Sequence, residues 1–188
     1  MRLVSLLFLA AMLAGCATAP QLPKIESSRG DRIGVLVEVG GNPAHTHVGT
    51  TVFNNFVKMY PYQWNLGVDV RRTIERSVKE AGFTVVDLRQ EGFDYQKVTG
   101  LIQATGDQWQ VAAGKKEIFR QLREQHKLKA LIVVKDARVV ATLECGGGPC
   151  TERYVDHSGL YTRSVFGYTS YRAVAAFPWE VYVLDPVA

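Results

Sequence analysis

No apolar run in this chain of 188 residues is long enough to cross a membrane as a helix. The longest stretch extends from Leu3 to Leu13 and is apolar apart from Ser5. A helix needs about 20 apolar residues to span the hydrocarbon core of a bilayer. We therefore do not expect a permanent transmembrane helix.

A strong charge of one sign is also lacking. The chain has 22 Lys and Arg against 18 Asp and Glu, which gives a formal net charge of +4 at pH 7, and the two signs are interspersed. Proteins that bind nucleic acids carry a concentrated basic patch or stripe. We therefore expect no nucleic-acid partner.

The short signatures of common enzymes are missing as well. The chain has no Gly-x-Ser-x-Gly, no His-Glu-x-x-His, no Gly-x-x-x-x-Gly-Lys, and no Gly-x-Gly-x-x-Gly after its first predicted strand. Asp156-His157-Ser158 contains the residue types of a catalytic triad, but three consecutive side chains diverge and cannot form its hydrogen-bonded chain. We expect a turn there, no enzymatic activity and no cofactor.

The first residues have the pattern of a signal peptide. Arg2 supplies one positive charge before the apolar run. The run ends in Leu13-Ala14-Gly15-Cys16, which resembles the lipobox of bacterial lipoproteins. The resemblance implies cleavage before Cys16 and a membrane anchor of acyl chains on that cysteine. The alternative is an ordinary secretory signal, cleaved at Ala17-Thr18-Ala19.

The residue after Cys16 indicates the membrane. In such lipoproteins an Asp at this position favours retention at the inner membrane, whereas here it is Ala17. The resemblance thus implies an outer-membrane lipoprotein that faces the periplasm. Residues 1–15 would be the signal peptide, residues 16–31, rich in Pro, Ser and charges, a flexible tether, and residues 32–188 a single domain.

The other two cysteines, Cys145 and Cys150, flank a loop of three glycines and a proline. In an exported chain this favours a disulfide between them, because the glycines allow the tight reversal that brings the two Cα atoms together. The alternatives are a redox-active pair, although the spacing is not Cys-x-x-Cys, or a metal site that also uses His157.

The apolar periodicity predicts an α/β (α+β) domain. Buried strands are expected at residues 33–39, 83–88 and 130–134, and amphipathic helices at 66–81 and 115–127.

Two longer stretches complete this prediction. Alternation over residues 135–143 predicts that the third strand continues, half exposed, and alternation over 171–183 predicts a last strand, which Pro178 places at an edge or a bulge. Residues 89–114 are interpreted as a loop with a short helix around 95–104. We expect a mixed sheet of about five strands with two main helices packed on one face.

This order of elements resembles the lipoprotein families of the curli-secretion protein CsgG, the penicillin-binding-protein activator LpoB and the amino-terminal domain of TolB. The likeness rests on residues 32–37, on the helix that leads through Gly82 into Phe83-Thr84-Val85-Val86-Asp87, and on residues 128–134. It implies an α/β envelope domain. We find no additional strands for a CsgG-like pore.

Three groups of residues are candidates for binding. His45 and His47 would share one face of an extended segment and form half of a metal site, or they are solvated loop residues. The helix at 115–127 has a basic face, either merely solvated or attractive to anionic polymers and headgroups. Tyr161, Phe166 and Tyr168 lie in a glycine-flanked stretch and would be core residues or an exposed protein-binding patch.

The leading hypothesis is a membrane-anchored, non-enzymatic domain that docks onto another envelope protein through residues 145–168, with homo-oligomers as a further option. The alternative is a periplasmic protein that binds a small ligand or a glycan, with or without hydrolysis, in a cleft where the first strand meets Gly40, Gly41 and His45.

Overall fold

The computed structural model describes residues 20–61, 63, 65–144 and 151–188. The predicted lipidation of Cys16 and the predicted Cys145–Cys150 disulfide lie outside these residues. Within them, no helix has the length and the apolar character needed to span a bilayer. The described part of the chain forms twelve strands in four sheets, together with three α-helices, so the class is α+β with mixed sheets.

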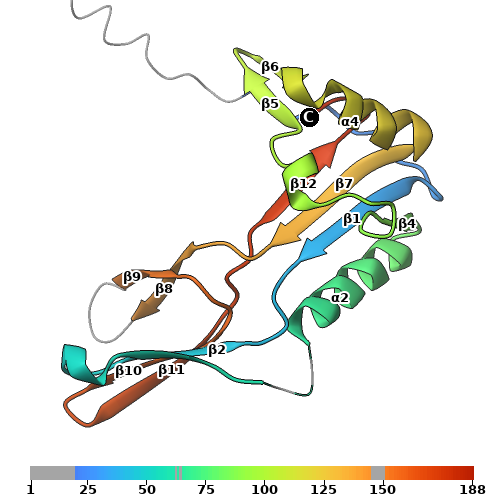
Figure 1. The fold of residues 1–188 in the computed structure, drawn as a ribbon. Helices are drawn as coiled ribbons and strands as arrows, with labels where there is room; N and C mark the ends of the chain where they lie inside the picture. Colours follow the sequence, from blue (N-terminus) through green and yellow to red (C-terminus); the bar gives the residue numbers. More distant parts are fainter. Residues whose placement is uncertain (1–19, 62, 64, 145–150) are drawn as a thin grey trace, which may run out of the picture.

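The first four-stranded sheet, which we call sheet A, contains the predicted buried strands (Figure 1). β1 pairs in parallel with β4 and with β7, and β12 pairs antiparallel with β7. In spatial order, the strands are β12 (Trp179–Val183), β7 (Leu128–Lys135), β1 (Arg32–Glu38) and β4 (Thr84–Asp87).

Helix α2 (Leu66–Glu80) connects β1 to β4 and covers one face of sheet A. The side chain of Asn65 caps its first turn by accepting a hydrogen bond from the Val68 amide at 3.1 Å. Gly82 ends the helical segment with φ +89°, a conformation that glycine adopts without strain. These boundaries confirm the predicted strand, helix and strand.

The other face of sheet A is covered by the segment between β4 and β7. Its elements are α3 (Tyr95–Val98), a hairpin of β5 (Ile102–Thr105) and β6 (Gln108–Val111), the short turn η2 (Ala113–Lys115), and α4 (Lys116–Arg120), which continues into the π-helical turn η3 (Gln121–Gln125). The prediction of two helices on one face is therefore wrong. Residues 131–134 of β7 are all apolar, so both faces of this strand carry apolar side chains and both need to be covered.

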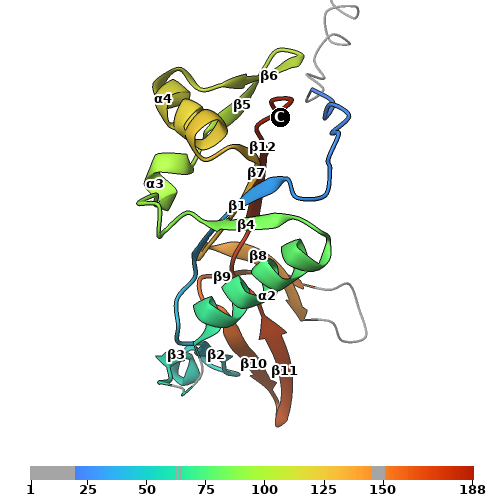
Figure 2. The same ribbon diagram turned by 90° about the vertical axis from the view of Figure 1, so that its right-hand side faces the viewer.

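The second four-stranded sheet, sheet B, projects away from sheet A (Figures 1 and 2). β10 pairs in parallel with β2 and antiparallel with β11, and β2 pairs antiparallel with β3. Its strands are β11 (Tyr168–Val174), β10 (Gly159–Val165), β2 (Ala44–Val48) and β3 (Phe56–Met59), with the 3₁₀ turn η1 (Val52–Asn54) between β2 and β3.

Both long alternating stretches are interrupted between the two sheets. After β7 the chain starts a separate strand, β8 (Val139–Glu144), which forms a hairpin with β9 (Thr151–Val155). The last stretch divides into β11 and β12, and the break includes Pro178, which cannot donate to a strand ladder. The prediction of one sheet of about five strands is thus wrong, because each long strand changes sheets.

The hairpin of β8 and β9 covers one face of sheet B. Leu143 of β8 and Val155 of β9 form a small buried cluster with Tyr161 of β10 and with Ala176. The opposite face of sheet B has no such cover among the described residues. Sheet B is therefore closed on one side and open on the other.

Candidate functional site

The open face of sheet B carries both histidines that the sequence singled out. His47 lies opposite Thr162 in the parallel pair of β2 and β10, and His45 is two residues earlier on the same face. His45 Nε2 and His47 Nδ1 each lie 2.7 Å from the Thr162 hydroxyl oxygen. Thr162 itself is buried, with 2% of its surface exposed.

A single hydroxyl between two imidazoles constrains the protons. When both rings are neutral, Thr162 can donate to at most one of the two nitrogens, so at least one ring must donate its N–H to the hydroxyl oxygen. Among the described residues, no group of three or more His, Cys, Asp and Glu side chains could hold a metal ion. The arrangement accounts for both histidines as a polar support of the open face.

Aromatic rings extend this face. The ring of Phe56 on β3 stacks on His47 and meets His45 edge to face, with 5.0 Å between centroids in both cases. Tyr60 lies beyond His45 at 6.4 Å, and the Lys58 ammonium lies over the Tyr60 ring at 5.1 Å. The open face is thus apolar and aromatic, with few charges.

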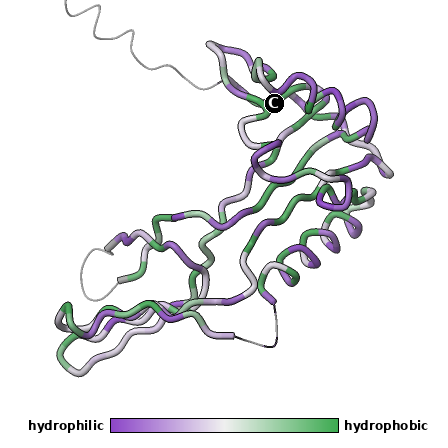
Figure 3. Tube along the Cα trace, viewed as in Figure 1, coloured by the Kyte–Doolittle hydropathy of each residue, from purple (hydrophilic) through white to green (hydrophobic). Residues whose placement is uncertain are grey.

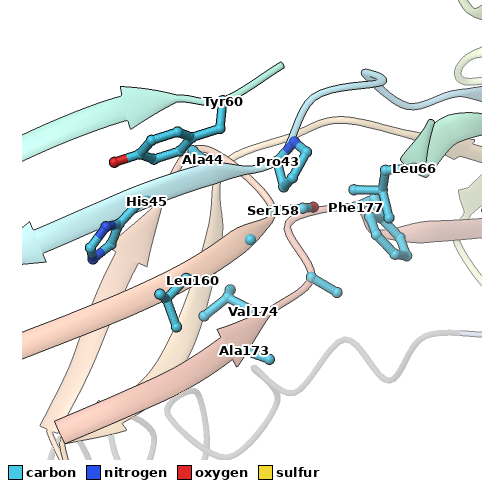
Figure 4. A pocket seen from close by; sticks show the side chains of 12 residues that line it. Pro43, Ala44, His45, Tyr60, Leu66, Ser158, Leu160, Ala173, Val174 and Phe177 are labelled. Atoms are coloured by element: carbon cyan, nitrogen blue, oxygen red, sulfur yellow. The ribbon is translucent and has the colours of Figure 1, made fainter. Parts of the chain in front are cut away.

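A pocket of about 520 Å³ lies where the open face meets sheet A (Figure 4). One of its polar groups, the Ser158 hydroxyl, is already engaged, since it accepts a hydrogen bond from the Ala176 amide at 2.8 Å. Most of the lining residues are apolar. The full lining consists of Pro43, Ala44, His45, Tyr60, Leu66, Ser158, Gly159, Leu160, Ala173, Val174, Ala175 and Phe177. Its size and lining are those of a site for an apolar ligand or for an apolar side chain of a partner.

A second, more polar pocket of about 280 Å³ lies near Gly41, at the carboxyl end of β1. It is lined by Asn65, Arg71 and Arg89 among others. The Arg71 guanidinium already lies 3.3 Å from a carboxylate oxygen of Asp87. The cleft predicted around the end of the first strand and His45 therefore corresponds to two pockets of different chemistry.

The end of sheet B farthest from sheet A carries the four most exposed large apolar side chains of the described residues. We call this group the distal tip; its members, with their exposed fractions, are Phe53 (93%), Phe166 (90%), Tyr168 (86%) and Val52 (75%). β2 and β10 are parallel neighbours, so the turns that follow them leave the sheet at the same end. Thr50 joins the turn after β2 to the end of β10 by donating its hydroxyl proton to the Ser164 carbonyl at 3.1 Å. Figure 3 shows hydrophobic residues at this end of the fold.

The backbone at Phe166 is strained. Val165 pairs with Tyr168, so Phe166 and Gly167 form a two-residue hairpin turn, with φ +46° and +86°. Turns of this kind favour Asn-Gly, because a side chain with a positive φ costs roughly 1–2 kcal/mol unless it is short and polar. The turn therefore holds a fully exposed phenylalanine in a position that disfavours it, and such outliers cluster at functional sites.

One of the three predicted contact residues does not belong to this surface. Tyr161 is 3% exposed, because its position in β10 points toward the β8–β9 hairpin. This burial argues against the predicted contact of Tyr161 with a partner. Phe166 and Tyr168 are exposed as that hypothesis requires, and Phe53 was not predicted from the sequence.

The basic face of the second predicted helix is largely engaged within the chain. Lys115 donates to the carbonyls of Gln96 and Lys97 at 2.8 and 2.9 Å. Arg123 and Lys129 pair with Asp185 at 3.3 and 3.4 Å. These contacts join the helix to neighbouring segments and favour the structural reading of its charges.

Two further polar groups have structural partners. Asp156 pairs with Arg138 at 3.4 Å, and the Ser158 hydroxyl accepts a hydrogen bond from the Ala176 amide. On sheet A, Glu180 accepts hydrogen bonds from the Tyr95 and Tyr182 hydroxyls at 2.8 and 2.6 Å. Burial and the hydrogen bond to Glu180 raise the pKa of Tyr182.

Comparison with protein-family models, with curated proteins and with solved structures finds no match to this chain.

Proposed function

We propose that this protein is a lipid-anchored, non-enzymatic docking protein of the bacterial cell envelope, which contacts another envelope protein through its distal tip. The anchor is the lipid on Cys16 that the lipobox resemblance implies, and the outer membrane is its expected place. The resemblance to the CsgG, LpoB and TolB families supports the same kind of envelope role.

The strained, exposed turn at Phe166 carries this proposal. An exposed aromatic side chain in water gains nothing from its exposure, and Asn would fit the turn better. Aromatic residues are enriched at the energetic centres of protein interfaces, and exposed apolar clusters mark such interfaces. Phe53 and Tyr168 extend this group into a surface that a partner can desolvate.

The position of the tip fits an anchored protein. The segment before β1 lies at the end of the molecule that also carries β5, β6 and the C-terminus, and sheet B lies at the other end in both views (Figures 1 and 2). An anchor that precedes this segment would therefore leave the distal tip directed away from the membrane. The tip could reach a partner that projects from elsewhere in the envelope.

Site-specific photocrosslinking in intact cells tests the proposal. We expect a photoreactive phenylalanine analogue at position 53 and at position 166 to capture the same envelope protein, identified by mass spectrometry. Lys116, exposed on α4 at the other end of the molecule, is the matched control position and should not capture it. Capture of nothing at the tip, or of the same proteins from Lys116, would refute docking through this surface.

A second candidate function is binding of an apolar small molecule in the pocket of about 520 Å³. The apolar lining favours a fatty acyl chain over a glycan, because a glycan requires many polar partners. We expect a fluorescent fatty acid to bind the protein saturably and Ala173→Trp, which fills the pocket, to weaken this binding by about tenfold or more. Ser170→Trp, on the opposite face of the same strand, is the control, and equal affinities of all three proteins would exclude the pocket.

A further inference from the structure

The two four-stranded sheets end in four edge strands, and β11 is the longest of them. β3 and β4 have four residues each, and β12 has five. β12 also follows Pro178 and carries Glu180, two features that discourage pairing with another strand. β11 has seven residues, of which all but the last are exposed.

The sequence of β11 contains little that protects an edge. Natural proteins protect exposed edges with Lys, Pro, bulges or very short strands. β11 reads Tyr-Thr-Ser-Tyr-Arg-Ala-Val, with Arg172 as its single charge and no Pro, Gly or acidic residue. In the described part of the chain a strand lies on one side of β11 and none on the other, so backbone donors and acceptors face outward. One of them, the Tyr171 carbonyl, accepts a hydrogen bond from the Arg172 guanidinium at 3.1 Å, which a second strand would replace.

We propose that β11 pairs antiparallel with β11 of a second copy of this chain, about a twofold axis at Tyr171. Sheet B of one copy and sheet B of the other then become one sheet of eight strands. In this register Tyr171 lies opposite Tyr171 of the partner subunit, and Arg172 lies opposite Ser170 of the partner subunit. The remaining pairs join Thr169 to Ala173 of the partner subunit and Tyr168 to Val174 of the partner subunit.

The sequence of β11 fits itself in this register. An isologous contact requires the same strand to offer both halves of every pair. Here the central pair is aromatic, the outer pairs combine aromatic with β-branched and polar with small side chains, and no two charges are opposed. Tyr171, which is 63% exposed in one copy, becomes covered by Tyr171 of the partner subunit.

The arrangement also suits two chains that share one membrane. A twofold axis through an antiparallel strand pair stands perpendicular to the sheet. The same face of sheet B therefore points in the same direction in both copies. The β8–β9 hairpin, sheet A and the segment before β1 all lie on one side of sheet B (Figure 1). Both N-terminal segments therefore leave the eight-stranded sheet on the same side.

Cysteine crosslinking of the full-length protein in cells tests this register. Directly opposed residues of an antiparallel pair have Cα atoms about 4.5 or 5.5 Å apart, within the range that a disulfide bridges. We expect Tyr171→Cys to form a disulfide-linked dimer on mild oxidation. Tyr168→Cys is the matched control: the residue is more exposed, but its symmetry mate lies six residues along the strand, roughly 20 Å away.

The expected result is about tenfold more dimer for Tyr171→Cys than for Tyr168→Cys, on non-reducing gels. Thr169→Cys and Ala173→Cys chains expressed together should also crosslink, although neither should do so alone. All variants keep Cys16, Cys145 and Cys150, so the parent protein shows any dimer that these form. No dimer at 171, or equal dimer at 168 and 171, would overturn the proposal, and continued capture of a partner at Phe166 would then leave the docking function intact.

Discussion

Replacement of Gly159 by Ala is expected to remove about 2–6 kcal/mol from the free energy of unfolding. Gly159 begins β10 and lies against Ala44 of β2 with φ +141°, a conformation that side chains rarely adopt. An added Cβ atom would collide with the carbonyl oxygen of Ala44 and lie 2.7 Å from its amide nitrogen. Because the obstacle is backbone, no rotation of a side chain can relieve it.

Urea unfolding of the full-length protein in detergent measures this loss, and Gly167→Ala is the matched control. Gly167 also has a positive φ, of +86°, but an added Cβ atom would meet nothing within 4 Å. Its replacement should therefore cost only the backbone strain, about 1 kcal/mol. Equal losses at the two positions would show that the close approach of β10 to β2 contributes nothing to stability.

The elements of sheet A could be predicted because their signals are local. The apolar residues of α2 recur at every third or fourth position, and together with the glycine at position 82 they define a helix and its end within a few residues of the chain. The distribution of helices over the two faces could not be predicted in this way. It depends on Leu122 and Val98 reaching the face of β7 opposite α2, and that packing is visible only when the chain is folded.

Sheet B was missed for a related reason. Its two parallel strands, β2 and β10, pair residues that are 115 positions apart in the chain. The period of two did place His45 and His47 on one face. Their shared partner, Thr162, lies 117 positions from His45 and 115 positions from His47 and gave no signal of its own.

The distal tip was predicted only in part. Phe166 and Tyr168 adjoin a glycine, and for this stretch the sequence left both a core and an exposed binding patch open. Tyr161 belongs to the same stretch, yet it lies in the regular part of β10, where alternation turns it toward Leu143 and Val155. Phe53 joins the tip through the parallel pairing of β2 with β10, a contact that the sequence does not reveal.

Phe166→Asn should separate stability from function, because it is expected to stabilise the protein and to weaken docking. Asn-Gly is the preferred pair for a two-residue hairpin turn with both φ values positive. Release of the strain at Phe166 should raise the free energy of unfolding by about 1 kcal/mol. Loss of an exposed aromatic anchor at an interface costs about 2 kcal/mol or more of binding, which corresponds to a decrease in affinity of roughly thirtyfold.

The measurement combines urea unfolding with recovery of the captured partner when the photoreactive group stands at position 53. Tyr154→Asn is the control, since Tyr154 is a 68% exposed aromatic residue on β9, where its ring contacts Arg138 and not the distal tip. It should leave partner recovery unchanged. A Phe166→Asn protein that is less stable than the parent would show that the phenylalanine serves the turn itself, and a more stable protein with undiminished recovery would remove Phe166 from the docking surface. We expect the Phe166→Asn protein to be more stable than the parent and to recover less partner, because Phe166 strains its turn but contacts the partner.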